Sequence, residues 1–104
     1  MIQQHPKKRI DIVIETLLID RITELLDRME ISGYSVMPLS GGRGRGGSWS
    51  SDGEIGIATQ MTALVCIVDA SVVDIVLRDI FQVISQQIGF VTVSDVSVIR
   101  PERF

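Results

Sequence analysis

The sequence has very few residues that bind metals or form disulfides. Its 104 residues include one cysteine, Cys66, and one histidine, His5. A lone cysteine cannot form an internal disulfide, and these two residues do not make a zinc site. Cys66 lies in an apolar run, where we expect a reduced, buried thiol. His5 lies in a polar N-terminal segment that we expect to be frayed. These shortages exclude a disulfide framework and support neither metal binding nor nucleophilic catalysis.

Positive charge and long apolar runs are also lacking. The formal net charge is −3, whereas a domain that binds duplex nucleic acid normally has a basic surface. No stretch reaches the roughly 18 apolar residues of a membrane span, and no signal-peptide core follows the polar N-terminus. Asp20, Glu24 and Asp27 lie on the polar face of an expected helix, where surface charges are common. The sequence therefore predicts a cytoplasmic protein that is not an enzyme, with no nucleic acid and no membrane insertion.

Aliphatic residues are abundant. Hydrophobic residues make up 45% of the chain and aromatic residues only 5%, so the apolar content is mostly isoleucine, valine and leucine. A chain of this length can bury one modest core. We expect a single domain over residues 1–104.

Apolar periodicity predicts two helices and four strands. Alternation of Ile10, Ile12 and Ile14 predicts a strand over 9–15. Further strands are expected over 34–39, 60–69 and 90–99, and helices over 16–31 and from Ser71 to just before Gly89.

Three local signals refine these boundaries. Gly33 is expected to stop the first helix, and Ser71 with Asp74 is expected to form a capping box for the second. The apolar alternation changes phase near Asp95, which predicts a bulge or an early end of the last strand.

The element order β-α-β-loop-β-α-β predicts an α+β, ferredoxin-like βαββαβ fold, with a four-stranded antiparallel sheet and two helices on one face. The third strand is apolar on both faces: one face carries Met61, Ala63, Val65 and Ile67, the other Leu64, Cys66 and Val68. Helices on one side would leave the second apolar face in water, and such a patch usually marks an interface. We therefore expect self-association through the open face of the sheet.

Residues 40–56 form a glycine-rich segment without periodicity, which includes Arg43, Arg45 and Trp49. Glycine permits close backbone approach, successive N–H groups bind anions, and arginine adds bidentate donors. The segment lacks the Gly-Lys-Ser/Thr of a P-loop, and the strand expected after it does not fit a Rossmann fingerprint. A flexible linker and an RGG-like RNA contact remain alternatives, although Trp49 argues against a pure linker.

The chain resembles the PII signal-transduction family over residues 8–103. The resemblance rests on the element order, on Gly33-Tyr34-Ser35-Val36 leading through Leu39-Ser40-Gly41 into a long loop, and on Ile67-Val68-Asp69 before the second helix. It implies a homotrimer with adenine nucleotides in the clefts between subunits. It also implies a T-loop over about residues 40–58, which engages a protein target such as an enzyme or transporter, and a C-terminal tail over 99–104.

The resemblance also implies a set of nucleotide-binding residues. The T-loop would begin beside the nucleotide, Ser35 and Ile67 would lie near the adenine, and Gly89 would match the glycine of the B-loop that holds phosphates. Arg43 or Arg45 would take the place of the T-loop basic residue, and two further arginines would replace a C-terminal basic pair. The full set is Ser35, Gly41, Gly42, Arg43, Arg45, Ile67, Gly89, Arg100 and Arg103.

Two departures from the family pattern bear on the ligand. Gly89 runs directly into Phe90-Val91-Thr92, so the usual B-loop Gly-Lys pair is absent, and the T-loop has no modifiable tyrosine. Fewer cations imply ADP or AMP in preference to ATP. The chain's C-terminus looks most like the carboxysome-associated PII group, which links adenine nucleotides and bicarbonate to inorganic-carbon metabolism. Two alternatives are a structural trimer or partner adaptor without ligand sensing, and a CutA-like ion-tolerance protein.

Overall fold

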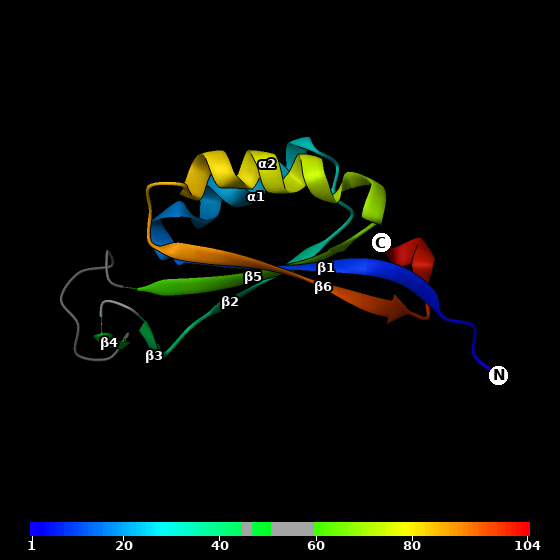
Figure 1. Cartoon of the computed structure of the whole chain (residues 1–104), viewed down its shortest axis with the longest axis horizontal. Coiled ribbons are helices and arrows are strands. Elements are labelled where there is room, and N and C mark those ends of the chain that lie inside the picture. The colour runs from blue at the N-terminus through cyan, green and yellow to red at the C-terminus, as the bar shows by residue number, and fades with distance from the viewer. Residues whose placement is uncertain (45–46, 51–59) are drawn as a thin grey trace.

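The computed structural model describes residues 1–44, 47–50 and 60–104. Two α-helices lie on one side of a long, twisted sheet, and the two termini lie near the same end of it (Figure 1). The strands are β1 (His5–Glu15), β2 (Tyr34–Pro38), β3 (Gly41–Gly44), β4 (Gly47–Ser50), β5 (Met61–Val68) and β6 (Gly89–Val98). The helices are η1 (Thr16–Leu18), α1 (Ile19–Arg28), η3 (Ala70–Val72), α2 (Val73–Ile84) and η4 (Pro101–Arg103), the three η elements being short 3₁₀ turns.

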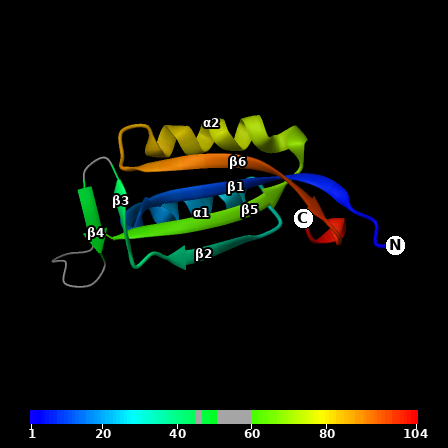
Figure 2. The same ribbon diagram turned by 60° about the horizontal axis from the view of Figure 1, so that its bottom comes forward.

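The main sheet has four strands in the order β2-β5-β1-β6, and every neighbouring pair is antiparallel (Figure 2). Ile10 of β1 lies opposite Cys66 of β5 on one side and Val93 of β6 on the other. This is the ferredoxin-like βαββαβ arrangement that the sequence predicts, with β3 and β4 forming a separate two-stranded sheet.

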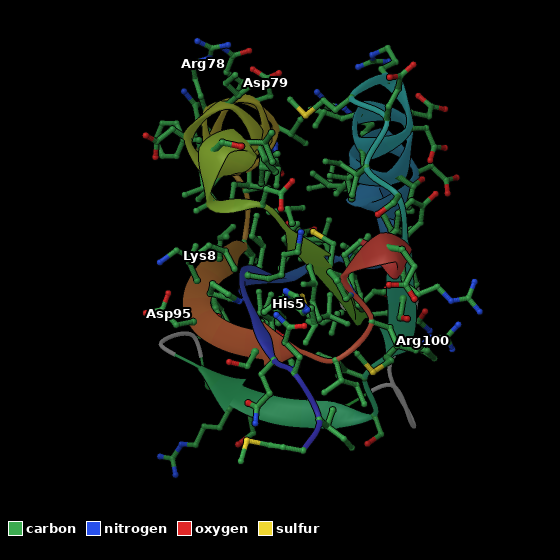
Figure 3. The ribbon with its side chains drawn as sticks, turned by 90° about the vertical axis from the view of Figure 1, so that its right-hand side faces the viewer. His5, Lys8, Arg78, Asp79, Asp95 and Arg100 are labelled. Carbon is green, nitrogen blue, oxygen red and sulfur yellow. The ribbon has the colours of Figure 1, made fainter. Side chains whose placement is uncertain are left out.

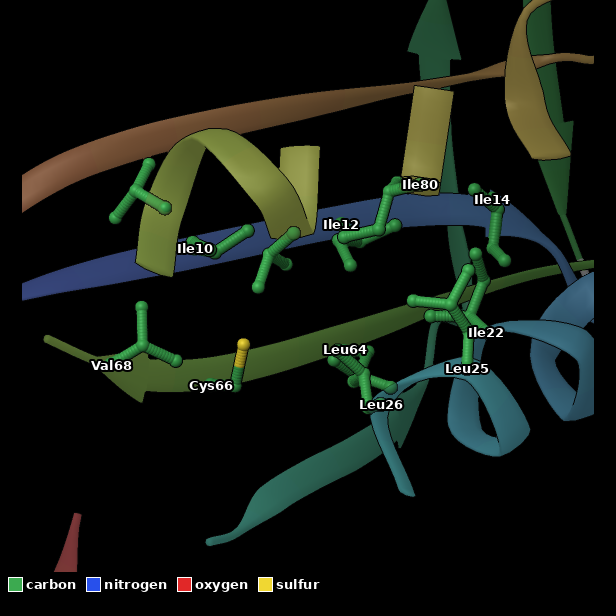
Figure 4. Packing of buried hydrophobic residues seen from close by; sticks show 12 residues of the cluster. Ile10, Ile12, Ile14, Ile22, Leu25, Leu26, Leu64, Cys66, Val68 and Ile80 are labelled. Carbon is green, nitrogen blue, oxygen red and sulfur yellow. The ribbon is translucent and has the colours of Figure 1, made fainter. Parts of the chain in front are cut away.

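The core lies between the helices and one face of the sheet (Figure 4). Alternate residues of β1 and β5 point toward the helices, because successive side chains of a strand face opposite sides. The helices contribute residues three or four apart to the same cluster. Burying each aliphatic side chain contributes roughly 1.5–3 kcal/mol. The buried members are Ile10, Ile12, Ile14, Ile22, Leu25, Leu26, Leu64, Cys66, Val68, Val73, Val76 and Ile80.

The opposite face of the sheet is also largely apolar at its centre, as predicted. Met61, Ala63, Val65 and Ile67 alternate with the buried residues of β5 and are only half-buried. The strand pairing places Val13 opposite both Ala63 and Phe90, and Met37 opposite Ala63. We call the surface formed by Val13, Met37, Met61, Ala63, Val65, Ile67 and Phe90 the open face. Neither helix covers it (Figure 1).

The end of α1 differs from the prediction. The helix stops at Arg28, and Glu30 adopts a left-handed backbone with φ of 58°. The amide of Ile31 donates to the carbonyl of Leu26 at 3.1 Å, and that of Glu30 donates to the carbonyl of Asp27 at 3.0 Å. This is a Schellman motif with glutamate in the position that glycine usually takes. The prediction that Gly33 stops the helix is therefore wrong.

Two other local predictions are wrong. The predicted capping box of Ser71 and Asp74 is absent, because the chain enters α2 through η3 and Val72 occupies its N-cap. The predicted bulge or early end near Asp95 is also absent, because β6 pairs with β1 in one unbroken register from Gly89 to Val98. The apolar residues of β6 change from one face of the sheet to the other near Asp95. The helix side of the sheet is polar there, because Asp95 forms an ion pair with Lys8 of β1.

The start of β1 also departs from expectation. His5 is not frayed but opens the strand opposite Val98. Among the described residues, no helix is long and apolar enough to cross a membrane.

Candidate functional site

Gly89 lies at a position where packing leaves no room for a side chain. Its φ is 156°, and a Cβ added there would come within 2.5 Å of the Val13 carbonyl oxygen and 2.9 Å of Ile14 Cγ2. A contact that short with backbone forces the chain to move. The glycine therefore lets β6 begin directly against the end of β1.

Three backbone amides of the turn between α2 and Gly89 are bonded within the chain. The amide of Ser85 donates to the Phe81 carbonyl at 2.9 Å, and that of Gln87 donates to the Ile84 carbonyl at 2.9 Å. The amide of Ile88 donates to Glu15 Oε1 at 3.3 Å. The β1–β6 ladder ends at Ile14 and Gly89, so the Glu15 carboxylate bonds the first amide beyond it.

The glycine-rich segment extends from the same end of the sheet. Leu39 donates its amide to the Met61 carbonyl at 3.1 Å, which ties the start of the segment to β5. Within this segment, which has no periodicity in the sequence, β3 pairs with β4, so that Gly42 lies opposite Trp49 and Arg43 opposite Ser48. Gly41, Gly42 and Arg43 are exposed. Arg45 and the rest of the segment over 51–59 lie outside the described residues, as does the side chain of Trp49.

The remaining predicted residues lie on β2 and β5 and around η4. Ser35 is opposite Val65, and Ile67 is two residues farther along β5, so the two are diagonal neighbours on the same face. Arg100 and Arg103 lie around η4, where the Arg103 amide donates to the Arg100 carbonyl at 3.1 Å. Arg100 Nε lies 3.5 Å from Glu102 Oε1.

A single chain does not bring the residues around Gly89 close to Arg100 and Arg103. Gly89 pairs with Ile14 at one end of β1, and Val98, which precedes Arg100, is nine residues farther along β6 and pairs with His5 at the other end. Nine residues of extended strand span about 30 Å. The glycine end and the arginine end therefore belong to opposite ends of the same sheet.

The arginine end carries two cations that were not predicted from the sequence as site residues. Lys7 forms an ion pair with Asp69. Lys8 forms one with Asp95 (Figure 3). Both lysines line a hollow of about 360 Å³ between β1, β6 and η3. The basic run Lys7-Lys8-Arg9 is the sequence signal that could have identified these lysines. Arg9 bonds Asp11 through Nε at 2.9 Å, so all three cations of this run have a carboxylate partner in the chain.

A second hollow lies away from both ends. It has a volume of about 420 Å³ and lies between α1 and α2, where Arg21 and Arg28 face Asp79 and Gln82. It contains none of the predicted nucleotide-binding residues.

Two groups, one in the core and one at its edge, have raised pKa values. Burial raises the pKa of the Cys66 thiol to about 11, with a further contribution from the negative charge of Asp11. The hydrogen bond from Tyr34 to the Asp27 carboxylate, 3.0 Å long, raises the pKa of that phenol. Among the residues that the structure describes, no three of the histidine, cysteine, aspartate and glutamate side chains gather to hold a metal ion.

The architecture defines a class: a ferredoxin-like protein whose second and third core strands are separated by a long glycine-rich segment, as in the PII-like signalling proteins. The model of the family described as nitrogen regulatory protein P-II matches residues 7–103. The chain belongs to this family, whose members are regulatory signalling proteins.

Solved structures support the assignment. CPII, a nitrogen regulatory PII-like protein from Thiomonas intermedia K12 bound to ADP, AMP and bicarbonate, superposes with a TM-score of 0.89. It is 25% identical, and the match covers 100% of this chain and 98% of that one. The same protein bound to ADP and bicarbonate gives a TM-score of 0.85 at 26% identity, covering 100% and 99% of the two chains. No curated protein matches the chain.

Proposed function

We propose that the chain is a homotrimeric sensor of adenine nucleotides, with ADP or AMP favoured over ATP. The observation that carries the proposal is the division of the predicted site between opposite ends of one sheet. Residues about 30 Å apart in one chain cannot contact one small ligand, but they can do so when the ends of two neighbouring copies meet. The open face supplies an apolar surface through which such copies could associate.

In the proposed cleft, the glycine end of one copy meets the arginine end of the next. The first copy contributes Gly41, Gly42 and Arg43, with Arg45 from the same segment and Gly89 from the turn. The second contributes Ser35 and Ile67 as an adenine surface, with Arg100 and Arg103 as phosphate ligands. Apolar and small polar groups suit the base, and guanidinium groups suit phosphate.

The relatives support the choice of ligand. CPII of Thiomonas intermedia was solved with ADP, AMP and bicarbonate, and this chain matches it over its full length. We infer that bicarbonate, a small anion, binds near the glycine-rich segment, where Arg43 and exposed glycines are available.

The proposed output is a change in the glycine-rich segment, which would act as the T-loop. Ordering glycine backbone is entropically costly, so a bound ligand can shift the populations of its conformations. The segment would then engage a protein target, an enzyme or a transporter of inorganic-carbon metabolism, in the cytoplasm or at the carboxysome.

Calorimetry with AMP, ADP and ATP, each with and without bicarbonate, tests the proposal. We expect saturable heats for ADP and AMP and a weaker response to ATP. Light scattering of the same samples should give about three times the chain mass of 11.5 kDa. A trimer without heat for any adenine nucleotide would favour the structural or adaptor alternative. A monomer would remove the cleft altogether.

A further inference from the structure

We propose that Glu15 is a specificity-determining residue of the nucleotide site, where its carboxylate disfavours ligands that carry a third phosphate. The inference rests on the proposed function, because it takes the turn beside Gly89 as the place where phosphates arrive. It adds a residue that the predicted site does not include and a reason for the preference for shorter nucleotides beyond a missing lysine.

The position of Glu15 follows from the strand register. Gly89 and Ile14 form the last rung of the β1–β6 ladder, and Ile88 and Glu15 are the next residues on each side. In place of a further rung, the Glu15 side chain accepts a hydrogen bond from the Ile88 amide at 3.3 Å. The carboxylate therefore lies at the turn immediately before Gly89.

The turn offers an incoming phosphate few free donors. Turns with successive free N–H groups bind anions well. Here the amides of Ser85 and Gln87 are bonded to helix carbonyls, and that of Ile88 is bonded to Glu15. Residues 85–89 read Ser-Gln-Gln-Ile-Gly and include no cation. A phosphate at this turn meets a negative charge and three amides that already have acceptors, those of Ser85, Gln87 and Ile88.

The repulsion depends on how much charge the ligand brings. AMP places its phosphate charge on one group, whereas ATP extends a chain of three phosphates and must keep more charge near the turn. A full negative charge within several ångströms of a carboxylate at a partly solvated site changes affinity by about tenfold. Salt weakens the effect where the site is open to solvent.

The test compares three proteins by calorimetry with AMP, ADP and ATP at low salt. Glu15→Gln removes the charge but keeps an oxygen that can accept the Ile88 amide, so the turn should hold. Glu24→Gln makes the same chemical change on the exposed surface of α1 and serves as the control. We expect Glu15→Gln to improve ATP binding relative to AMP by about tenfold. The ratio should not change in Glu24→Gln.

The outcomes distinguish a failure of the role of Glu15 from a failure of the proposed nucleotide-sensing function. If the proteins bind nucleotides but Glu15→Gln leaves the ATP-to-AMP ratio unchanged, the role of Glu15 is wrong and the proposed function stands. An equal shift in Glu24→Gln would also overturn the role, since net charge alone would explain it. Absence of binding to all three nucleotides in every protein overturns the proposed function and this inference with it.

A second variant keeps the test decisive if Glu15→Gln does not fold. Gln87→Lys leaves Glu15 in place and adds an opposing charge at the exposed turn. It should also improve ATP binding relative to AMP by several-fold, and more so at low salt than at high salt. An unchanged ratio in this variant would contradict electrostatic selection at the turn.

Discussion

The two faces of the sheet are similar in sequence but differ in what they contact. Along β5, Leu64, Cys66 and Val68 point to the helices and are buried, whereas Ala63, Val65 and Ile67 alternate with them and stay half-buried. Both sets are apolar. The fold of one chain needs only the first set, because α1 and α2 cover one side alone (Figure 1). The second set lies on the open face, through which we propose that the copies associate.

The comparison also separates two kinds of stability. Contacts on the helix side form within each chain, so their contribution to folding does not depend on protein concentration. Contacts that other copies make with the open face would depend on concentration, because association follows mass action. Substitutions on neighbouring residues of one strand can therefore distinguish the two faces.

The largest expected effect is on assembly. Val65→Lys places an ammonium group at the centre of the open face. In a single chain the long side chain can reach water, but an assembled face would bury the charge beside Asp11, whose carboxylate is already bonded to Arg9. We expect the particle mass to fall from about three chains to one chain of 11.5 kDa in light scattering.

The control for this variant places lysine outside the open face. Phe81 of α2 is 63% exposed, so Phe81→Lys should leave the mass unchanged. An intact assembly in Val65→Lys would mean that the open face is not the interface.

The next effect compares adjacent residues on opposite faces. Ile12 is fully buried against the helices, and Ile12→Ala should lower the free energy of unfolding by about 2–5 kcal/mol in urea titrations. Val13 points to the open face and is half-buried. Val13→Ala should cost less, and its cost should fall on dilution as neighbouring copies dissociate. Equal, concentration-independent losses would contradict the distinction between the faces.

A smaller effect on stability is expected at Gly89, where the pairing of β1 with β6 ends. Gly89→Ala brings a Cβ against the Val13 carbonyl in a backbone conformation that side chains avoid. We expect a loss of about 1–3 kcal/mol in the free energy of unfolding. Gly33→Ala is the matched control, since a Cβ there meets nothing within 4 Å. It should be neutral or stabilise by up to about 1 kcal/mol. Similar losses at both positions would show that the close contact at Gly89 is not the cause.

Sequence patterns predicted the fold well because they reflect burial. Alternation in β1 and β5 and the spacing of apolar residues in α1 and α2 correspond to the observed core. Gly89 was expected as the end of the second helix and, from the family resemblance alone, as the B-loop glycine; the structure shows that packing against Ile14 leaves no room for a side chain there. Sequence patterns did not identify Glu15, because a carboxylate that bonds a backbone amide 73 residues away leaves no local pattern. Sequence patterns also did not identify the C-terminal end of α1. Glycine usually occupies the left-handed position that ends a helix, and this chain has Glu30 there.

The smallest effect concerns Glu30, which belongs to neither face. Its left-handed backbone, with φ of 58°, is strained for a residue with a Cβ and comfortable for glycine. Glu30→Gly should therefore raise the free energy of unfolding by about 0.5–1 kcal/mol in thermal or urea titrations, with the mass in light scattering unchanged. Glu30→Ala removes the same charge but keeps the Cβ, so it should not stabilise. If both variants stabilise equally, removal of the charge is the cause. If Glu30→Gly destabilises, the Schellman turn at the end of α1 does not form in solution.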